Sequence, residues 1–312
     1  MGLGLLGSQP ALASPPEALV NAEVTGSGAV VATDDDFVIS GQQISVDGGT
    51  FYEDGGDSYV IYNNGYSGKI SGNTLTVSAV SSTTFGIHVA GGDVKVTDNT
   101  IAADDDVGNQ FLAVGFTAGA TGQVKKNEIK GAHRVGVLGR GTGTDVAVSN
   151  NTITGPGPRS TGWADNGVQI GSGATGKVKN NTIDDHWYSP NTFNSAGLLA
   201  FSDNVVVQRN HFGDNDIGVA FLGDRNNVIH NTVEVTTETT NTNHYGVYEI
   251  GGTNNGIRQN TVTTEATANG LVGIIVLGDN AKLIRNDLDG WEDLLLDAGD
   301  GTKLPKPFDP DA

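Results

Sequence analysis

The sequence of 312 residues contains no cysteine, a single methionine and few aromatic residues, which make up 6% of the chain. Without cysteine, disulfide bonds and thiol chemistry are excluded. With one methionine and scattered histidines, a site for a soft metal ion is disfavoured. No apolar run approaches the roughly 18–20 residues that a membrane-spanning helix needs. Glycine, by contrast, is abundant at 46 residues, which indicates a chain rich in turns.

Basic residues are also scarce. The 17 Lys and Arg residues are outnumbered by 36 Asp and Glu residues, so the formal net charge is −19. This charge disfavours nucleic acid and anionic membrane surfaces as partners, because both are themselves negatively charged. Much of it comes from Asp runs typical of turns, such as residues 34–36 and 104–106, which indicate a solvated or salt-adapted surface.

The most regular feature of the chain is an Asn-Thr-Ile motif that recurs, with near-copies, nine times. A β-branched or aliphatic residue stands three positions before each asparagine. The asparagines are Asn73, Asn99, Asn127, Asn151, Asn181, Asn210, Asn231, Asn260 and Asn286. Repeats of 20 to 50 residues indicate a solenoid. Asparagine tolerates the left-handed backbone of a turn, and its amide can hydrogen-bond to the next copy about 4.8 Å away, so we expect a structural ladder.

A second motif, a glycine with apolar neighbours, lies between successive asparagines and gives each repeat short runs of period-two alternation. Its glycines are Gly86, Gly115, Gly136, Gly167, Gly197, Gly218, Gly246 and Gly273. No helical spacing of apolar residues separates these runs, which predicts a parallel β-helix. The pattern over residues 55–300 closely resembles the right-handed parallel β-helix repeat family of the pectate-lyase-like superfamily. The resemblance implies an all-β, right-handed solenoid, here of about ten coils, that binds or cleaves sugars.

The ends of the chain have separate expected roles. Residues 1–14 resemble a truncated signal segment, because an apolar stretch precedes the small-x-small pattern Ala-Leu-Ala at 11–13. Residues 15–54 are expected to form an N-terminal cap and the first strands, and residues 301–312 a C-terminal tail, since open β-helix ends expose strand edges. We expect a secreted, periplasmic or cell-surface protein, a monomer or a trimer, without membrane insertion.

The alternation around the motif glycine predicts which side chains face solvent. With glycine at position 0, the apolar residues at −1 and +1 are expected to point inward, and positions −2, 0 and +2 outward. A row of bare glycines would then form a shallow groove along the axis. Alternatively, the glycines relieve a bulge or a tight bend at a corner. Both interpretations stay open on the sequence alone.

Polar residues at position −2 of the central repeats form the candidate site, next to the longest loops, which often carry function. The candidate catalytic residues are Arg134, Asp165, Asp216 and His244. Candidate substrate-binding residues, which can stack on a sugar or hydrogen-bond to it, are Trp163, Trp187, Tyr188, Asn194, Asn215 and Tyr248. The alternative interpretation is an exposed row of ion pairs, which would contribute little to stability.

Two reactions suit the residue types of this site. Hydrolysis needs two carboxylates across a glycosidic bond, and Asp165 and Asp216, two coils or about 9.6 Å apart, suit inversion. Elimination needs a base, for which Arg134 or His244 qualifies, and a group that neutralises the uronate. Asp165 and Asp216 can also hold Ca²⁺, the one candidate cofactor, through oxygen ligands.

Glu249 falls at a position that the alternation places inside the coil. Either the register shifts locally at this residue, or a buried acid with a raised pKa marks the site.

The resemblance does not extend to the sequence blocks of familiar enzymes. Most polygalacturonase blocks and the pectate lyase Arg-x-Pro-x-x-Arg block are absent, and Asp184-Asp185 is the only partial match. The main hypothesis is an exported protein that binds or processes a polysaccharide, with lyase, hydrolase and epimerase all open. The alternative is a non-catalytic, spike-like glycan-binding or structural β-helix. Ice binding is disfavoured, because Glu128, His211 and Asp287 interrupt the Thr column that follows the asparagines.

Overall fold

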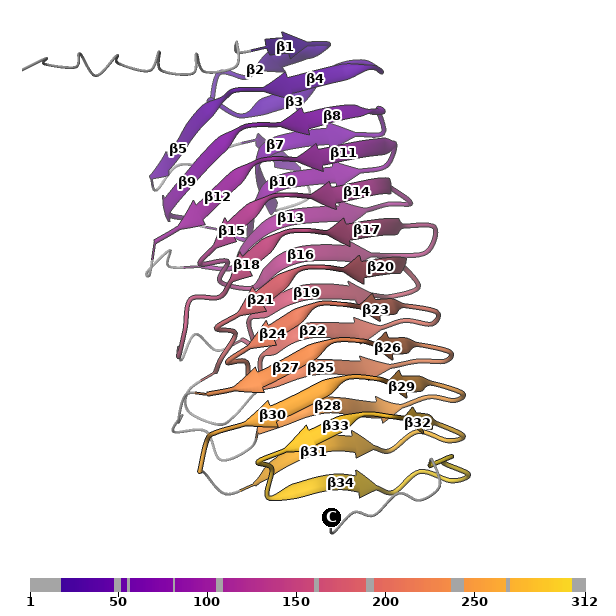
Figure 1. Ribbon diagram of the computed structural model, residues 1–312. Helices are drawn as coiled ribbons and strands as arrows, with labels where there is room; N and C mark the ends of the chain where they lie inside the picture. Colours follow the sequence, from indigo (N-terminus) through magenta and orange to yellow (C-terminus); the bar gives the residue numbers. More distant parts are fainter. Residues whose placement is uncertain are drawn as a thin grey trace, which may run out of the picture.

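The computed structural model describes residues 18–47, 52–54, 57–80, 82–104, 109–159, 163–188, 194–236, 244–267 and 270–304. These residues form β-strands wound around one axis, and they include no helix that could cross a membrane (Figure 1). The strands assemble into three long sheets, called A, B and C below. The expected signal segment at residues 1–14 lies outside the described residues.

Each sheet runs the length of the molecule. Sheet A contains β1 (Ala18–Val20), β4 (Phe37–Ser40), β8 (Gly68–Ser71), β11 (Asp93–Thr97), β14 (Thr121–Lys125), β17 (Asp145–Ser149), β20 (Thr175–Lys179), β23 (Val206–Gln208), β26 (Asn227–Ile229), β29 (Gly256–Arg258) and β32 (Lys282–Ile284). Sheet B contains β2 (Ala22–Val24), β3 (Val30–Ala32), β6 (Tyr52–Asp54), β7 (Asp57–Asn64), β10 (Thr84–Ala90), β13 (Phe111–Thr117), β16 (Val135–Arg140), β19 (Asn166–Gly171), β22 (Ala196–Phe201), β25 (Ile217–Leu222), β28 (His244–Gly251), β31 (Leu271–Val276) and β34 (Asp293–Asp297). Sheet C contains β5 (Gln43–Asp47), β9 (Thr74–Ala79), β12 (Thr100–Ala103), β15 (Glu128–Lys130), β18 (Thr152–Thr154), β21 (Thr182–Asp184), β24 (His211–Gly213), β27 (Thr232–Val235), β30 (Thr261–Thr264) and β33 (Asp287–Asp289).

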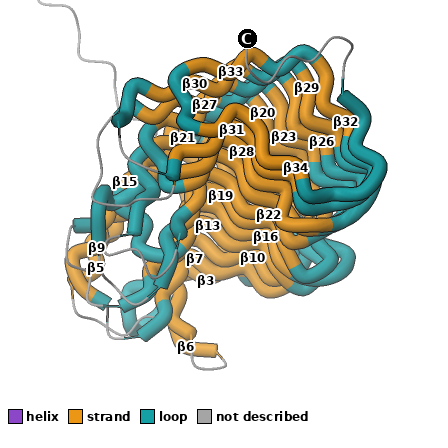
Figure 2. Tube along the Cα trace, turned by 90° about the horizontal axis from the view of Figure 1, so that it is seen from below, coloured by secondary structure: helices purple, strands orange, loops and turns teal. Residues whose placement is uncertain are grey.

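Successive coils, from β7-β8-β9 to β31-β32-β33, each add one strand to sheets B, A and C in turn. Neighbouring coils pair in parallel, as β10 does with β7 and β13. At the N-terminal end, β1 and β2 pair antiparallel with β4 and β3. Figure 2 looks along the axis and shows the strands of each sheet stacked over one another. The predicted parallel β-helix is confirmed.

The interior is one continuous apolar cluster built from the repeat itself. The aliphatic residue three positions before each ladder asparagine lies on sheet A and points inward, as Val96, Val148 and Val178 do. The residue that follows the Asn-Thr pair faces it from sheet C, as Ile153 and Ile183 do. Each coil therefore places apolar side chains at the same two positions of the interior. Stacking of coils extends the core without a change in its cross-section.

The asparagines form the predicted ladder at the corner between sheets A and C. The side chains from Asn73 to Asn260 are buried and that of Asn286 is half-buried. Nδ2 of Asn151 donates to Oδ1 of Asn181 at 2.9 Å and to the carbonyl of Val124 at 3.0 Å. The same pattern repeats from Asn73 to Asn286. The left-handed backbone, however, belongs to the preceding residue, such as Asn150 with φ 56°. The asparagine serves as a hydrogen-bonding group, and its neighbour makes the turn.

The motif glycines face the core, so the predicted outward strip of glycines is wrong and the bend interpretation is correct. A Cβ atom on Gly167 would lie 2.3 Å from Cγ2 of Ile183 and 2.6 Å from the carbonyl oxygen of Gly197. The next residue, Val168, is also fully buried. Two consecutive residues therefore point inward, and the strand bends between them. Because of this bend, positions −1 and +2 face outward, three residues apart.

One glycine does not belong to this column. Gly115 pairs with His88 and Leu138, whereas Ala113 lies opposite the position of Gly86 and Gly136. The motif match at Gly115 is thus two residues out of register.

Candidate functional site

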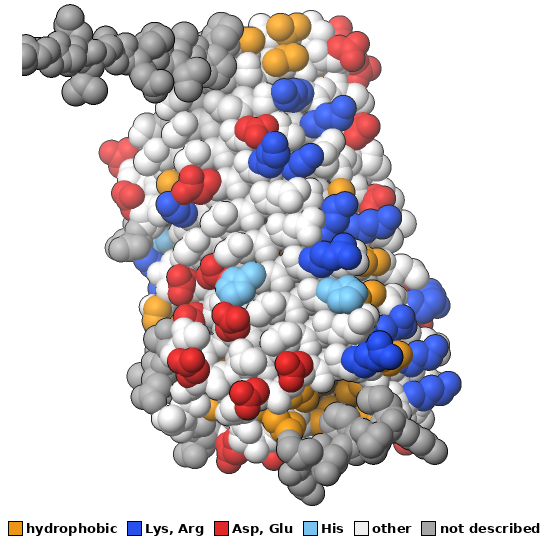
Figure 3. All heavy atoms as spheres, viewed as in Figure 1, with side chains coloured by type: hydrophobic (Ala, Val, Ile, Leu, Met, Phe, Trp, Pro, Cys, Tyr) orange, Lys and Arg blue, Asp and Glu red, His pale blue; other side chains and the backbone are white. Residues whose placement is uncertain are grey.

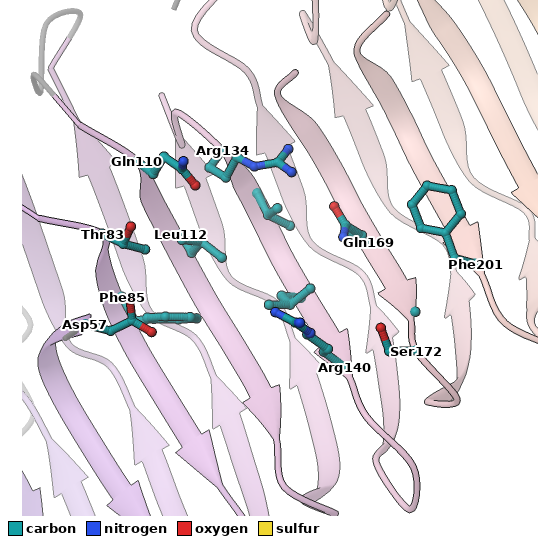
Figure 4. A pocket seen from close by; sticks show the side chains of 13 residues that line it. Asp57, Thr83, Phe85, Gln110, Leu112, Arg134, Arg140, Gln169, Ser172 and Phe201 are labelled. Carbon is teal, nitrogen blue, oxygen red and sulfur yellow. The ribbon is translucent and has the colours of Figure 1, made fainter. Parts of the chain in front are cut away.

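A groove lies on the outer face of sheet B, over the central coils. Its volume is about 390 Å³, and residues from β7 to β22 line it (Figure 4). The side chains come from positions −1 and +2 of successive strands and from the residues at the strand ends. Those that matter most for chemistry are Phe85, Gln110, Arg134, Arg140, Gln169 and Phe201. The face with the glycine-containing strands therefore does carry a groove, but outward side chains form it.

The floor of the groove is apolar. Phe85, Leu112, Val135 and Leu138 form a cluster on the outside of sheet B, separate from the interior core. In Figure 4 the ring of Phe85 stands at one end of the groove and that of Phe201 at the other. Phe201 is 43% exposed, so its ring is open to a ligand.

Aromatic rings continue the floor toward the N-terminal end. The ring centroid of His88 lies 4.5 Å from that of Phe85 and 4.7 Å from that of Tyr59, and both pairs are stacked. Tyr59 in turn stacks on Tyr62 at 4.7 Å. These four residues place a run of flat ring systems in line with the groove.

Two guanidinium groups flank the floor. Arg134 precedes β16 and Arg140 ends it, and Asp57 is the only acidic residue that lines the groove among the described residues. Nη1 of Arg134 donates to the carbonyl of Ala164. Burial lowers the pKa of Arg134 below its ordinary value, although the charge of Asp165 opposes this. The groove is thus locally basic in a chain whose net charge is −19.

The polar row at position −2 lies in consecutive coils, as its spacing predicts, but most of it is not exposed. Asp165 and Asp216 are fully buried and His244 is 1% exposed, so the expected solvent-facing column is wrong. With −1 outward, normal alternation turns −2 inward. In other coils the same position holds Phe111 and Leu271 of the apolar core. Among the row, Arg134 is the member that reaches the groove.

Asp165 stands directly behind Arg134. Burial raises the pKa of Asp165 from 3.8 to about 7, against the opposing charges of Arg134 and Arg159 and with a further rise from Asp216. Neither carboxylate oxygen of Asp165 accepts a hydrogen bond among the described residues. The Arg134–Asp165 pair is therefore a buried acid and a partly buried base whose pKa values are both shifted toward the neutral forms, a property found at functional sites.

Asp216 has a different environment. Its Oδ2 accepts the backbone N–H of Tyr188 at 2.7 Å and that of Ser195 at 3.0 Å, and Oγ of Ser195 accepts the N–H of Asp165 at 3.0 Å. This carboxylate holds the residues on both sides of the loop between β21 and β22. Across the described ranges, no group of three or more His, Cys, Asp or Glu side chains is arranged to hold a metal ion. The structure thus gives the expected Ca²⁺ site no such ligand set.

Of the expected sugar-binding residues, Trp187, Tyr188 and Asn215 are buried and are not among the described residues that line the groove. The ring of Trp187 meets that of His244 edge-on at 6.1 Å. Asn215 donates to the carbonyl of Ile183 and accepts the N–H of His186, which is a structural role.

The remaining three, Trp163, Asn194 and Tyr248, are half-buried. Trp163 Nε1 donates to the carbonyl of His133, and Tyr248 packs edge-on against Tyr245 at 5.4 Å. None of the three lines the groove in the part of the chain that the structure describes.

A family model for the right handed beta helix region matches residues 112–288. The chain belongs to this right-handed β-helix family. No match was found among the curated proteins.

Among solved structures, the chain is similar to DFA-IIIase from Arthrobacter chlorophenolicus A6 without its lid (14% identity, 80% of this chain and 67% of that chain, TM-score 0.44). It is also similar to the A-module of the mannuronan C-5 epimerase AlgE6 of Azotobacter vinelandii (11% identity, 85% and 92%, TM-score 0.42). A third is the surface protein and adhesin PfbA of Streptococcus pneumoniae (10% identity, 84% and 92%, TM-score 0.34).

Sequence reasoning missed several groove residues of this β-helix. Arg140, Gln110 and Phe201 lie at strand ends, outside the columns counted from glycine. The signal that would have found the floor is the spacing of three between Tyr59 and Tyr62 and between Phe85 and His88, which marks outward positions on either side of the bend.

Both interpretations of Glu249 hold in part. Glu249 is fully buried opposite Phe221, and the register of β25 and β28 shifts immediately after this pair. Burial raises the pKa of Glu249 from 4.5 to about 7, although a hydrogen bond from Asn255 at 2.6 Å opposes the rise. Glu249 faces the interior and not the groove, so it is no part of the candidate site.

Proposed function

We propose that the protein is an exported β-helix that binds an acidic polysaccharide lengthwise in the groove of sheet B. The observation that carries the proposal is the lining of the groove: Arg134 and Arg140 stand above an apolar floor with Phe85 and Phe201 at its ends. Ligand sites of this type combine apolar and aromatic surface with a few placed polar groups.

The charge of the lining favours an acidic glycan over a neutral one. A guanidinium group donates two parallel hydrogen bonds to a carboxylate, which fixes both the position and the orientation of a uronate. Gln110 and Gln169 supply amide donors and acceptors for hydroxyl groups. The aromatic rings of Phe85 and Phe201 offer flat apolar faces to sugar rings. An uncharged chain would offer no carboxylate to the two guanidinium groups.

Binding is tested with a panel of oligouronates and uncharged oligosaccharides in titration calorimetry. Arg134→Gln combined with Arg140→Gln is expected to weaken oligouronate binding at least tenfold, since hydrogen bonds to charged groups contribute about 1.5–3 kcal/mol each. The matched control is Lys130→Gln on sheet C, which removes a charge away from the groove. Equal affinity for uncharged chains, or unchanged affinity in the double variant, contradicts the proposal.

A second candidate function, cleavage or epimerisation of the bound glycan, is favoured by the Arg134–Asp165 pair. Arg134 is a base with a lowered pKa that lines the groove, and the pKa of the buried acid behind it, Asp165, is raised to about 7; such a pair suits a reaction that moves a proton. In this reaction class Arg134 touches the substrate, whereas Asp165, fully buried behind it, sets the charge and position of Arg134.

Catalysis is tested by following absorbance at 235 nm, reducing ends and the C5 configuration of uronates after incubation with the same panel. For an enzyme, Asp165→Asn is expected to leave oligouronate binding in place and to shift the pH profile of turnover. Absence of product with every glycan that binds leaves the protein as a binding module alone.

A further inference from the structure

The basic residues of this acidic chain gather on sheet A. Ten of its 17 Lys and Arg residues occupy three neighbouring columns: the two outward columns of sheet A and the left-handed turn residue that follows each strand. The two sheet columns are those of Lys95 and Thr97 on β11; a third outward column, that of Asp93, is not included. The ten residues are Lys69, Lys95, Lys125, Lys126, Lys177, Lys179, Arg209, Arg258, Lys282 and Arg285, called the basic face below. His230 occupies the same turn column, and Asp98 is the one acidic residue in the three columns.

The charges of the basic face are not neutralised within the molecule. All ten side chains are exposed or half-exposed, and none of them forms an ion pair in the described part of the chain. Figure 3 shows the blue side chains along the side formed by sheet A, while most red side chains in that view lie over sheet C. Positive charges that are clustered, exposed and unpaired create a local attractive potential for anions despite the overall charge.

The basic face is long and narrow. It runs from Lys69 on β8 to Arg285 after β32, and β17 is the only strand in this run whose coil lacks a Lys, Arg or His in the three columns. At about 4.8 Å per coil the face is on the order of 38 Å long. Its direction follows the solenoid axis. This shape fits an extended polymer that lies along the molecule.

The width of the face argues against a flat membrane. Asp93 and Asp145 stand on the edge of sheet A nearest sheet B, and Asp203 and Asp224 lie in the turns beside it. A planar anionic surface would approach these carboxylates as well as the lysines, at distances within a Debye length of about 8 Å. A single polymer chain on the three columns avoids them.

The residues between the charges favour a polysaccharide over a nucleic acid. The same columns hold Thr97, Gln123, Gln208 and Asn227, whose hydroxyl and amide groups match the hydroxyl groups of sugars. Within the three columns of the described coils there is no Phe, Tyr or Trp. Binding of single-stranded nucleic acid relies on stacking of bases on such rings.

We propose that the basic face of sheet A is a second binding surface, which holds a linear anionic polysaccharide along the axis. It is separate from the groove of sheet B, because the two lie on different sheets of the coil and share no residue. The groove recognises a few sugar units, whereas the basic face holds a long chain through many weak charge contacts. Two binding surfaces on one solenoid lengthen the residence time of the protein on a polymer, because both surfaces can bind the same polymer at once.

The test uses the full-length protein and retardation in native gels that contain polygalacturonate, alginate or uncharged dextran. The variant is Lys69→Gln, Lys95→Gln, Lys177→Gln and Lys179→Gln together, and the matched control carries Arg at the same four positions. The Gln variant is expected to lose at least tenfold in affinity for the two polyuronates at low salt and to depend less on salt, as the loss of several charge contacts to a polyanion requires. The Arg control retains both properties, and dextran retards neither.

Separate arms distinguish this proposal from the groove and from other polyanions. The groove variant with Arg134→Gln and Arg140→Gln should lose affinity for short oligouronates, but the long polymers should still retard it in a salt-sensitive way. The proposal is overturned if the polyuronates retard the Gln variant as strongly as the wild-type protein. It is also overturned if they do not retard the wild-type protein at low salt. Equal or tighter binding to oligo(dT) or to vesicles containing phosphatidylserine also overturns it, because the partner then belongs to another class.

Discussion

The two corners that flank sheet C are built in opposite ways. At the corner between sheets A and C, one left-handed residue turns the chain in coil after coil, and the buried asparagine beside it satisfies its hydrogen bonds within the ladder. At the corner between sheets C and B, the side chains of Asp165 and His186 are fully buried and form no hydrogen bond among the described residues. Burial lowers the pKa of His186 to about 3.

The difference separates what holds the solenoid together from what it can do. A corner whose buried polar groups are all paired contributes stability and leaves no group for chemistry. A corner with unpaired ionisable groups costs stability, and such groups persist where they serve a site. The groove of sheet B lies beside this second corner, and Arg134 is the residue of the polar row that lines it.

Val148→Asp should have the largest effect. Val148 is fully buried on β17, and an unpaired charge at its position has no partner in the apolar core. Loss of several kcal/mol of stability is expected, enough to unfold the adjacent coils. Circular dichroism and the melting temperature measure it. The control is Ala147→Asp, whose side chain points outward on the same strand. An unchanged melting temperature in Val148→Asp would show that this column does not face the core.

Asn151→Ala breaks the ladder corner at its centre. Asn151 Oδ1 accepts two hydrogen bonds from Asn127, and its Nδ2 donates two more. Removal leaves buried donors and acceptors unpaired, for a loss of about 2–4 kcal/mol of unfolding free energy. Chemical denaturation measures the loss, with the exposed neighbour Thr152→Ala as control. A loss no larger than that of the control would mean that the ladder is not a source of stability.

Gly167→Ala tests the inward direction of the glycine column. The added methyl group would lie 2.3 Å from Cγ2 of Ile183, and overpacking of this kind costs about 1–3 kcal/mol. Gly171 on the same strand provides the control, because a methyl group there finds its nearest atom 3.5 Å away, on Phe201. Equal stability of the two alanine variants in denaturant titrations would restore the outward-facing interpretation.

Glu249→Gln should have the smallest effect, and one that depends on pH. The pKa of Glu249 is raised from 4.5 to about 7, so the carboxyl group contributes stability below pH 4.5, and that contribution is lost as pH rises through about 7. Between pH 5 and pH 8, the free energy of unfolding of the glutamine variant should therefore rise relative to that of the wild type, by at most about 3 kcal/mol. Melting temperatures across this range measure the gain, with exposed Glu265→Gln as control. A constant difference between variant and wild type would refute the raised pKa.

The fold could be predicted from the sequence because each coil repeats the same short sequence pattern. The asparagine, the aliphatic residue three positions before it and the apolar residue two positions after it recur in every coil. The site could not be predicted to the same extent. Counting alternate residues assumes an unbent strand, but the bend at Gly167 places two successive residues inside. That single displacement moved Asp165 and Asp216 from the expected surface into the interior.

Two further features depend on the register between coils. The stack of Tyr59, Phe85 and His88 brings together residues from β7 and β10, and only the pairing of these strands reveals it. The basic face is spread thinly along the sequence, and it becomes visible once residues are aligned on the ladder asparagines. Net charge alone concealed it, because acidic residues elsewhere outweigh it.

A crystal structure of the protein soaked with an oligouronate would show whether the groove of sheet B binds an acidic glycan. The expected result is electron density for the sugars along the outer face of sheet B, with carboxylates within hydrogen-bond distance of Arg134 and Arg140 and a sugar ring against Phe85 or Phe201. Density confined to another face of the solenoid, or an empty groove at a saturating oligouronate concentration, would contradict the account.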